Sequence, residues 1–406
     1  MIPVRIILFL ISFVPIFFFQ DVMADEWDFG GNVSIGLRIF PEDVKFSDQD
    51  NYHFDPSIKL EPEVSYEFTG GNDRLTLIPF FRYDLEDDDR THFDIREGNW
   101  LHTESNWSLL VGNDIVFWGV TESRHLVDII NQIDFVEDLD NEDKLGQPMI
   151  NIIYDSNIGS FEFYYMPFFR ERTFPSADAR LRGPLPISNN PEYESDLKEF
   201  HPDFAFRWVN TIKEFDIGLS FFWGTSREPI FLVEENQNGK MFFRPFYTII
   251  NQVALDLQWT RDAWLLKLEA IGRGGQGSYF FATVFGFEYT IFQLFNTDAD
   301  LGLVSEYLYD GRDENIEFAP PTFFDNDIFG GLRLALNDTN DTQVLVGLTT
   351  DTKNAEMLGI VEASRRIGNS FVIELVCRLF MNPEEGTIFS GFSNDSFVDL
   401  SLSYYF

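Results

Sequence analysis

Histidines are the residues of this chain with the most distinctive chemistry, and acidic residues near them could complete an acid–base pair. None of the histidines has the His-x-x-x-His or His-Glu-x-x-His spacing with which one helix face binds zinc. The histidines are His53, His92, His102, His125 and His201. His92 follows Asp87–Asp89, and His125 lies between Glu122 and Asp128, so these two are the candidates for general acid–base chemistry. No Gly-x-Ser-x-Gly motif accompanies them, and we expect no enzyme, although a hydrolase assembled from distant side chains stays open.

Carboxylates form three runs along the chain, over 86–89, 137–143 and 310–317. Their oxygens could bind a divalent cation, or together they could attract cations to an opening. The spacing lacks the twelve-residue loop and central glycine of an EF-hand, so solvation of surface loops is the alternative. Whether a metal binds stays open, and no motif indicates an organic cofactor.

The overall composition is strongly acidic and rich in phenylalanine. There are 67 Asp and Glu against 29 Lys and Arg, a formal net charge of −38, which repels phosphate backbones and excludes nucleic-acid binding. Phenylalanine occurs 46 times, yet only 44% of residues are hydrophobic. This excludes both a helical membrane protein and a disordered acidic chain.

The first 24 residues have the pattern of a secretory signal peptide. A positive start ending at Arg5 precedes the apolar run 6–19, and residues 22–24 form a small-residue cleavage site. The run is shorter than the roughly 20 apolar residues of a spanning helix. We therefore expect residues 1–24 to be removed and residues 25–406 to form a single exported domain, because no linker-like tract divides them.

Apolar and polar side chains alternate with a period of two along residues 25–406. In the last segment Val398, Leu400 and Leu402 share one face, whereas Asp399 and Ser401 share the other. An apolar face toward lipid and a polar face toward a lumen is the pattern of a transmembrane barrel strand. Closure of the sheet is required in lipid, since an open edge would leave backbone N–H and C=O groups unpaired.

The connections between these segments alternate between short and long, as the periplasmic turns and outer loops of a barrel do. Counting the segments predicts an all-β fold, an antiparallel transmembrane β-barrel of about 18 strands, with 16 as the alternative. One predicted strand covers 242–259. The predicted long connections are 41–55, 85–91, 115–146, 169–200, 224–241, 273–277, 309–325, 351–354 and 382–392.

The polar face of the predicted strands carries both charges. Basic residues facing acidic ones could create a transverse field in a water-filled pore, or the two could neutralise each other as cross-strand ion pairs. The predicted pore-lining residues are Arg38, Lys59, Glu61, Glu63, Arg82, Arg96, Lys267, Glu269, Arg333, Glu374 and Arg378.

The connection 115–146 is predicted to fold into the lumen and constrict it, because its start, residues 116–119, is too apolar for a solvated loop. Apolar spacing over 123–133 predicts a short amphipathic helix with Ser123 as a possible N-cap, and such a helix needs a surface to pack on. Its polar face would bias the pore toward cations. A position over the barrel mouth, or against a neighbouring subunit, is the alternative. The residues assigned to the constriction are Trp118, Asp128, Asn131 and Asp134.

The C-terminal segment 398–406 ends in an aromatic residue and resembles the signal by which Gram-negative outer-membrane barrels are recognised by their assembly machinery. The resemblance implies that Tyr404 and Phe406 carry this signal. Residues 93–146 are similar to a largely uncharacterised group of porin-like barrels. The matching motifs, in order, are Arg96-Glu97, Trp107-x-Leu109-x-x-Gly112, Trp118-Gly119 and Asp128-x-x-Asn131-x-x-Asp134. Asn113-Asp114 and Gln132 depart from the Arg-Gln and Pro of that group.

These observations favour a channel in the outer membrane of a Gram-negative bacterium, which passes small polar solutes or ions through a partly constricted lumen. A ligand-binding or metal-chelate receptor barrel is the alternative, and an outer-membrane hydrolase is a lesser one. The expected partners are outer-membrane lipid, the barrel assembly machinery and small polar solutes or cations. The oligomeric state stays open.

Overall fold

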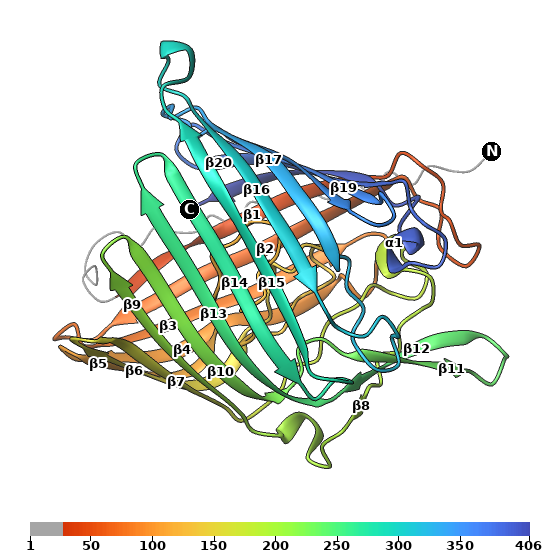
Figure 1. Ribbon diagram of the computed structural model, residues 1–406, viewed down its shortest axis with the longest axis horizontal. Coiled ribbons are helices and arrows are strands. Elements are labelled where there is room, and N and C mark those ends of the chain that lie inside the picture. Colours follow the sequence, from red (N-terminus) through yellow and green to blue (C-terminus); the bar gives the residue numbers. More distant parts are fainter. Residues whose placement is uncertain (1–26) are drawn as a thin grey trace, which may run out of the picture.

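A computed structural model describes residues 27–406, whose strands curve into one closed barrel (Figure 1). Eighteen strands form a single antiparallel sheet, and pairing of the first strand with the last closes it. The prediction of 18 strands is confirmed, and 16 is excluded. The predicted signal peptide, residues 1–24, lies outside the described residues.

The barrel strands have lengths of 8 to 14 residues. They are β1 (Trp27–Ile39), β2 (Phe54–Glu67), β3 (Asp73–Asp84), β4 (His92–Thr103), β5 (Trp107–Asp114), β6 (Gln147–Ser156), β7 (Gly159–Met166), β9 (Asp203–Ile212), β10 (Phe215–Thr225), β13 (Ile249–Arg261), β14 (Trp264–Gly274), β15 (Phe280–Ile291), β16 (Asp300–Asp310), β17 (Asn326–Ala335), β18 (Gln343–Asp351), β19 (Met357–Ile367), β20 (Phe371–Met381) and β21 (Phe397–Tyr405).

Helical segments are few and short, and all lie in connections. They are the 3₁₀ turns η1 (Arg180–Arg182), η2 (Lys198–Phe200) and η3 (Leu294–Asn296) and the helix α1 (Ile388–Gly391). No helix within residues 27–406 is long and apolar enough to cross a bilayer.

Alternation along the strands places apolar residues on the outer face, whereas the inner face is largely polar and carries buried apolar residues on several strands from β5 to β17. On β1, Ile35 is 56% exposed, whereas the preceding Ser34 is 5% exposed. At the closure of the barrel Arg38 lies opposite Asp399 of β21, and their side chains form a 3.1 Å ion pair. The apolar outer face suits contact with lipid, while the polar groups find their partners inside.

One predicted strand is wrong. Residues 242–259 form two strands with a break at Thr248, and only the second, β13, belongs to the barrel. The first, β12 (Met241–Tyr247), pairs with β11 (Ile230–Glu235) and with the short β8 (Glu192–Tyr193) in a separate three-stranded sheet. The hairpin partner of β12 is β11, which lies inside the predicted loop 224–241. The periodicity of a segment does not reveal such a partner. In Figure 1 this hairpin extends beyond the barrel at one end.

The two ends of the barrel differ, as the sequence predicts. The connections at one end, which we call the short-turn end, are tight, such as the one that joins β6 to β7. The other end, the long-loop end, carries the long connections. Two of them, residues 115–146 between β5 and β6 and residues 167–202 between β7 and β9, are named loop L3 and loop L4 below.

Candidate functional site

Loop L3 crosses the lumen in an irregular course, and the helix predicted over 123–133 does not form. Glu269 of β14 accepts hydrogen bonds from three backbone N–H groups of the loop, at 2.7, 3.1 and 3.1 Å. Glu306 of β16 accepts two more, from Glu122 and Ser123, each at 2.8 Å. The Ser123 hydroxyl also donates to Glu306, at 2.6 Å, instead of capping a helix. The helix is absent because the Val127 N–H, which would bond the Ser123 carbonyl in that helix, donates to Glu269 instead.

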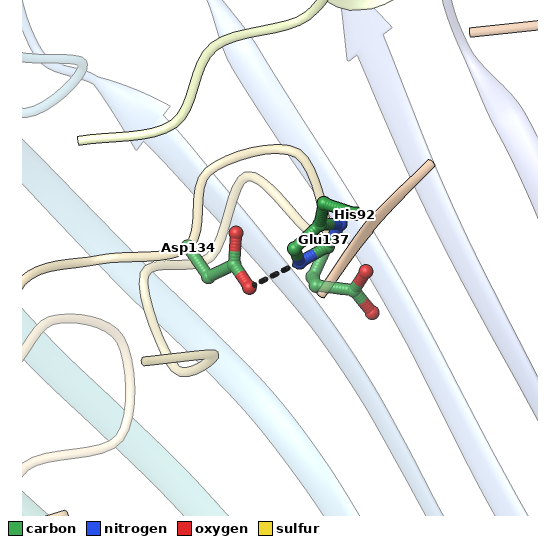
Figure 2. A group of neighbouring side chains, drawn as sticks. All are labelled: His92, Asp134 and Glu137. Carbon is green, nitrogen blue, oxygen red and sulfur yellow. Dashed lines mark hydrogen bonds and ion pairs between the residues drawn. The ribbon is translucent and has the colours of Figure 1, made fainter. Parts of the chain in front are cut away.

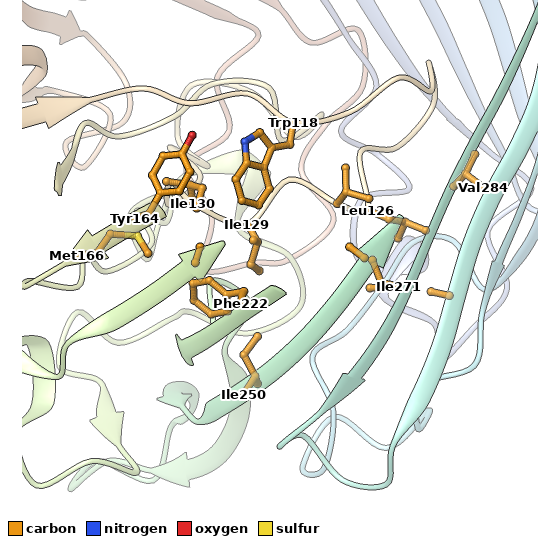
Figure 3. Close-up of a cluster of buried hydrophobic side chains, with 14 of the residues drawn as sticks. Trp118, Leu126, Ile129, Ile130, Tyr164, Met166, Phe222, Ile250, Ile271 and Val284 are labelled. Atoms are coloured by element: carbon orange, nitrogen blue, oxygen red, sulfur yellow. The ribbon is translucent and has the colours of Figure 1, made fainter. Parts of the chain in front are cut away.

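Apolar side chains of loop L3 pack against the inner face of the strands from β5 to β17 (Figure 3). Leu126, Ile129 and Ile130 are at most 4% exposed and belong to one cluster with Phe222 of β10 and Ile250 of β13. This arc of the lumen is therefore filled by a dry core. Burial of each such side chain contributes about 1.5–3 kcal/mol.

Three of the predicted constriction residues hold the loop together. Trp118 is 3% exposed and packs edge-on against Tyr164, with ring centroids 5.6 Å apart. Asn131 accepts a hydrogen bond from the Val116 N–H at 2.8 Å and donates to backbone carbonyls at both ends of the loop. Asp128 pairs with Lys144. These contacts fix the course of loop L3 inside the barrel.

The fourth constriction residue, Asp134, lies in a charged network on the opposite arc of the wall. Its carboxylate is fully buried and contacts Arg96 at 2.6 Å and His92 at 3.0 Å, both on β4 (Figure 2). Three residues further along, Glu137 pairs with Arg82 of β3 at 2.5 Å. The loop is thus attached to this arc by ion pairs rather than by apolar packing.

Two more wall arginines complete the attachment. Arg378 of β20 contacts Asp138 at 3.2 Å and Asp140 at 2.8 Å, and Arg38 donates to the backbone carbonyl of Glu137 at 3.0 Å. The second acidic run, 137–143, is therefore partly neutralised, because Glu137, Asp138 and Asp140 pair with wall arginines, whereas Glu142 and Asp143 are exposed to solvent.

The predicted pore-lining residues fall into two groups. Seven of them contact loop L3: Arg38, Arg82, Arg96, Lys267, Glu269, Arg333 and Arg378. The other four have no hydrogen bond or ion pair to this loop among the described residues: Lys59, Glu61, Glu63 and Glu374. Glu374 instead accepts a hydrogen bond from Ser401 at 3.0 Å, and Glu63 lies 3.8 Å from Arg74. Neutralising pairs therefore occur along much of the inner wall.

Two loop residues have pKa values that the network displaces. Burial raises the pKa of Asp134, but the hydrogen bond from His92 and the charge of Arg96 outweigh it and hold that pKa well below its usual range. Burial lowers the pKa of His125, but the carboxylates of Glu142 and Glu269, at 3.7 and 3.9 Å, raise it to about 10. Both side chains are charged at neutral pH and attract their partners.

The two histidines proposed for acid–base chemistry, His92 and His125, take part in this network of charged contacts. The ring of His92 uses both nitrogens, one with Asp134 and the other with the Arg90 carbonyl at 2.9 Å, so neither nitrogen is free to accept a proton from a substrate. Asp87–Asp89 are not its partners. His92, Asp134 and Glu137 lie close enough together to hold a metal ion, but a cation there would have to displace the arginines already bound to both carboxylates.

Several buried residues that organise the lumen carried no signal in the sequence. Arg227, between β10 and β11, donates twice to the Ile130 carbonyl of loop L3, at 2.8 and 3.0 Å, and pairs with Asp203 at 2.6 Å. Arg180 of loop L4 is fully buried and bonds Asp395, which lies 215 residues away. Neither residue belongs to a periodic segment, so only their distant partners reveal their roles.

A cavity of about 300 Å³ remains between loop L3, the other long loops and the inner wall of β17 to β20. Its lining includes apolar residues of the wall, such as Leu345, Ile360 and Phe380. It also includes charged groups, such as Arg172 of loop L4 and Arg273 of β14. The space left by the loop is amphipathic, which suits a ligand with both apolar and polar parts.

Known structures share this architecture. The chain is similar to OccAB3 of Acinetobacter baumannii, with 9% identity over 93% of this chain and 99% of that chain and a TM-score of 0.53. It is also similar to OccK3 (OpdO) of Pseudomonas aeruginosa, with 9% identity over 93% and 96% and a TM-score of 0.53. No protein-family model and no curated protein matches. The likeness shows the fold, the closed antiparallel barrel of outer-membrane porins.

Proposed function

We propose that the protein is a channel in the outer membrane of a Gram-negative bacterium and that small polar solutes or ions pass through its lumen. The observation that carries the proposal is a closed barrel with an apolar outer face and a charged inner wall, whose lumen is narrowed but not filled by loop L3. A polar interior is typical of barrels with a water-filled lumen, so the polar wall supports a path for water and solutes.

Current through single molecules in planar bilayers tests the proposal. The purified barrel, verified by heat-modifiable migration in electrophoresis, should insert with discrete conductance steps in potassium chloride. Vesicles that contain it should also admit small sugars. A folded barrel that neither conducts nor admits sugars would contradict channel function.

A ligand-binding receptor barrel is the second candidate, because the long loops are tied together across the lumen. Arg170 of loop L4 bonds Asp94 of the wall at 2.9 Å, and Gln132 of loop L3 bonds the Arg170 carbonyl at 3.1 Å. Such ties would hold a ligand cavity closed at rest. The absence of conductance together with saturable binding would favour this candidate.

Phe406 is proposed to act during assembly. It follows β21, is 53% exposed and stacks with Tyr404, with ring centroids 6.2 Å apart. Deletion of Phe406 should lower the amount of barrel inserted in cells more than it lowers the stability of barrel refolded in detergent. Replacement of Phe371, which lies beside Tyr404 on the neighbouring strand, by Leu serves as the control. Wild-type insertion of the truncated chain would contradict the recognition role.

A further inference from the structure

The cavity beside loop L3 contains one charged side chain without a counter-charge. Arg172 of loop L4 lines the cavity, and no carboxylate lies within 4.0 Å of its guanidinium among residues 27–406. Its one side-chain hydrogen bond in the described chain is a long one, from Nε to Gln132 at 3.4 Å. Its two terminal nitrogens have no hydrogen bond among the described residues, so their donors are available to a ligand in the cavity.

The other charged groups that line this cavity are paired, which makes Arg172 distinct. Arg124 pairs with Asp310 at 3.0 Å, Arg227 with Asp203, and Arg273 with Glu228. The same holds for the acidic lining residues, since Glu122, Asp128 and Glu142 contact Arg333, Lys144 and His125. Arg172 is thus the one charged lining residue that has no ion pair among the described residues.

Four phenylalanines from three connections gather beside Arg172. The guanidinium carbon lies 5.9 Å from the ring centroid of Phe135 in loop L3. Phe135 contacts Phe174 of loop L4, which contacts Phe231 of β11, and that ring contacts Phe243 of β12, with centroid distances of 6.2, 5.8 and 5.4 Å. All four line the cavity. An aromatic ligand can stack on the faces of such rings or contact their edges.

From this arrangement we infer that the cavity binds a small organic anion with an aromatic body, whose acid group meets Arg172 and whose ring packs on the phenylalanines. A guanidinium presents two parallel N–H donors that fit a carboxylate, and the pair is strong where water is largely excluded. The lining also includes Leu345, Ile360 and Phe380 of β18 to β20, and these apolar side chains disfavour small hydrated ions.

The inference deepens the proposed function, because it assigns a solute class to the path through the barrel. Its test is independent of conductance: isothermal titration of the full-length, detergent-solubilised barrel with phenylacetate, against empty micelles as the blank. Acetate, which lacks the ring, and 2-phenylethanol, which lacks the charge, are the matched ligands. Phenylacetate should bind saturably at one site and at least about tenfold more tightly than either.

Variants separate the two halves of the site. Arg172→Gln should weaken phenylacetate binding about tenfold or more and leave 2-phenylethanol unchanged, and Arg172→Lys should fall between. Phe174→Leu should weaken both aromatic ligands. Arg365→Gln, which removes an exposed arginine paired with Asp338 at the short-turn end, is the control and should change nothing.

Three results would overturn the inference: no saturable phenylacetate binding to heat-modifiable barrel, equal affinity for acetate and phenylacetate, or an unchanged affinity in folded Arg172→Gln. A barrel that conducts potassium chloride but does not bind phenylacetate overturns this inference alone. A barrel that binds phenylacetate but carries no current overturns the channel proposal alone.

Discussion

Loop L3 is held on two arcs of the lumen by different forces. Against β5 to β17 it buries apolar side chains such as Leu126 and Ile130 in a dry cluster. Against β3, β4 and β20 its carboxylates meet arginines, as in the pairs of Asp134 with Arg96 and of Glu137 with Arg82. Apolar side chains do not titrate, whereas ion pairs respond to pH. The comparison indicates that one arc holds the loop chiefly by packing and the other chiefly by charge.

The ionic arc need not be the more stabilising one. Removing two charges from water costs several kcal/mol per ion, and the attraction between them about offsets this cost. Removing one partner is different, because it leaves a buried charge without compensation. The two arcs should therefore differ most when single partners are deleted.

The largest effect is expected from deletion of residues 121–144, which removes both attachments. Conductance should rise severalfold because the loop no longer occupies the lumen. The deleted segment has eight acidic residues against Arg124 and Lys144, so cation preference should weaken as wall arginines lose their partners. Planar-bilayer currents under a salt gradient measure both. Deletion of 236–239, at the hairpin tip, is the control; unchanged conductance and selectivity in a folded 121–144 deletion would reject the constriction.

The next largest effect is expected on the ionic arc, from Asp134→Asn. The amide keeps the shape but leaves His92 without a counter-charge and Arg96 with Asp94 alone, which should lower the free energy of unfolding by about 3–5 kcal/mol. Equilibrium unfolding in urea from detergent micelles measures the loss. Asp338→Asn, which breaks an exposed pair with Arg365, should have a much smaller effect. Similar losses in the two variants would show that burial of the network is unimportant.

On the apolar arc, Ile130→Ala should lower the free energy of unfolding by about 2–4 kcal/mol, because it leaves a cavity in the cluster. The loss should not depend on pH between 5 and 9, which distinguishes it from the ionic variants. Val346→Ala, on the outer face of β18, is a matched aliphatic control. A strongly pH-dependent loss for Ile130→Ala would mean that the two arcs do not act separately.

A rise of one pH unit above neutrality should have the smallest effect. The pKa of His125 is raised to about 10 in the folded state from an ordinary value of 6.5, so its contribution is complete below pH 6.5 and lost as pH rises through 10. The free energy of unfolding should fall by at most about 1.4 kcal/mol for each pH unit in this window. His125→Gln should remove that slope, and the same slope in the variant would assign it to another group.

The sequence alone determined the barrel, because the alternation of apolar and polar residues that indicates it is a local pattern. A strand places successive side chains on opposite faces wherever it runs, so alternation such as that of 398–402 survives without knowledge of any neighbour. Lipid then requires that the sheet close, and the sorting of connections into short and long fixes the strand count. The sheet to which residues 242–247 belong could not be predicted, because the periodicity of a strand does not say which sheet it joins.

Only the tertiary structure decided the interior. Which side chains point inward followed from alternation, yet what they meet depends on chain segments far away: Arg378 meets Asp140 at a separation of 238 residues, and Glu306 meets Ser123 at 183. Glu269 also overruled a local helix signal over 123–133, because this charged acceptor on the wall binds the Val127 N–H in place of the Ser123 carbonyl, and a short helix is marginal by itself. Arg172 likewise differs from the other arginines only in the folded structure, where the other charged residues that line the cavity form ion pairs.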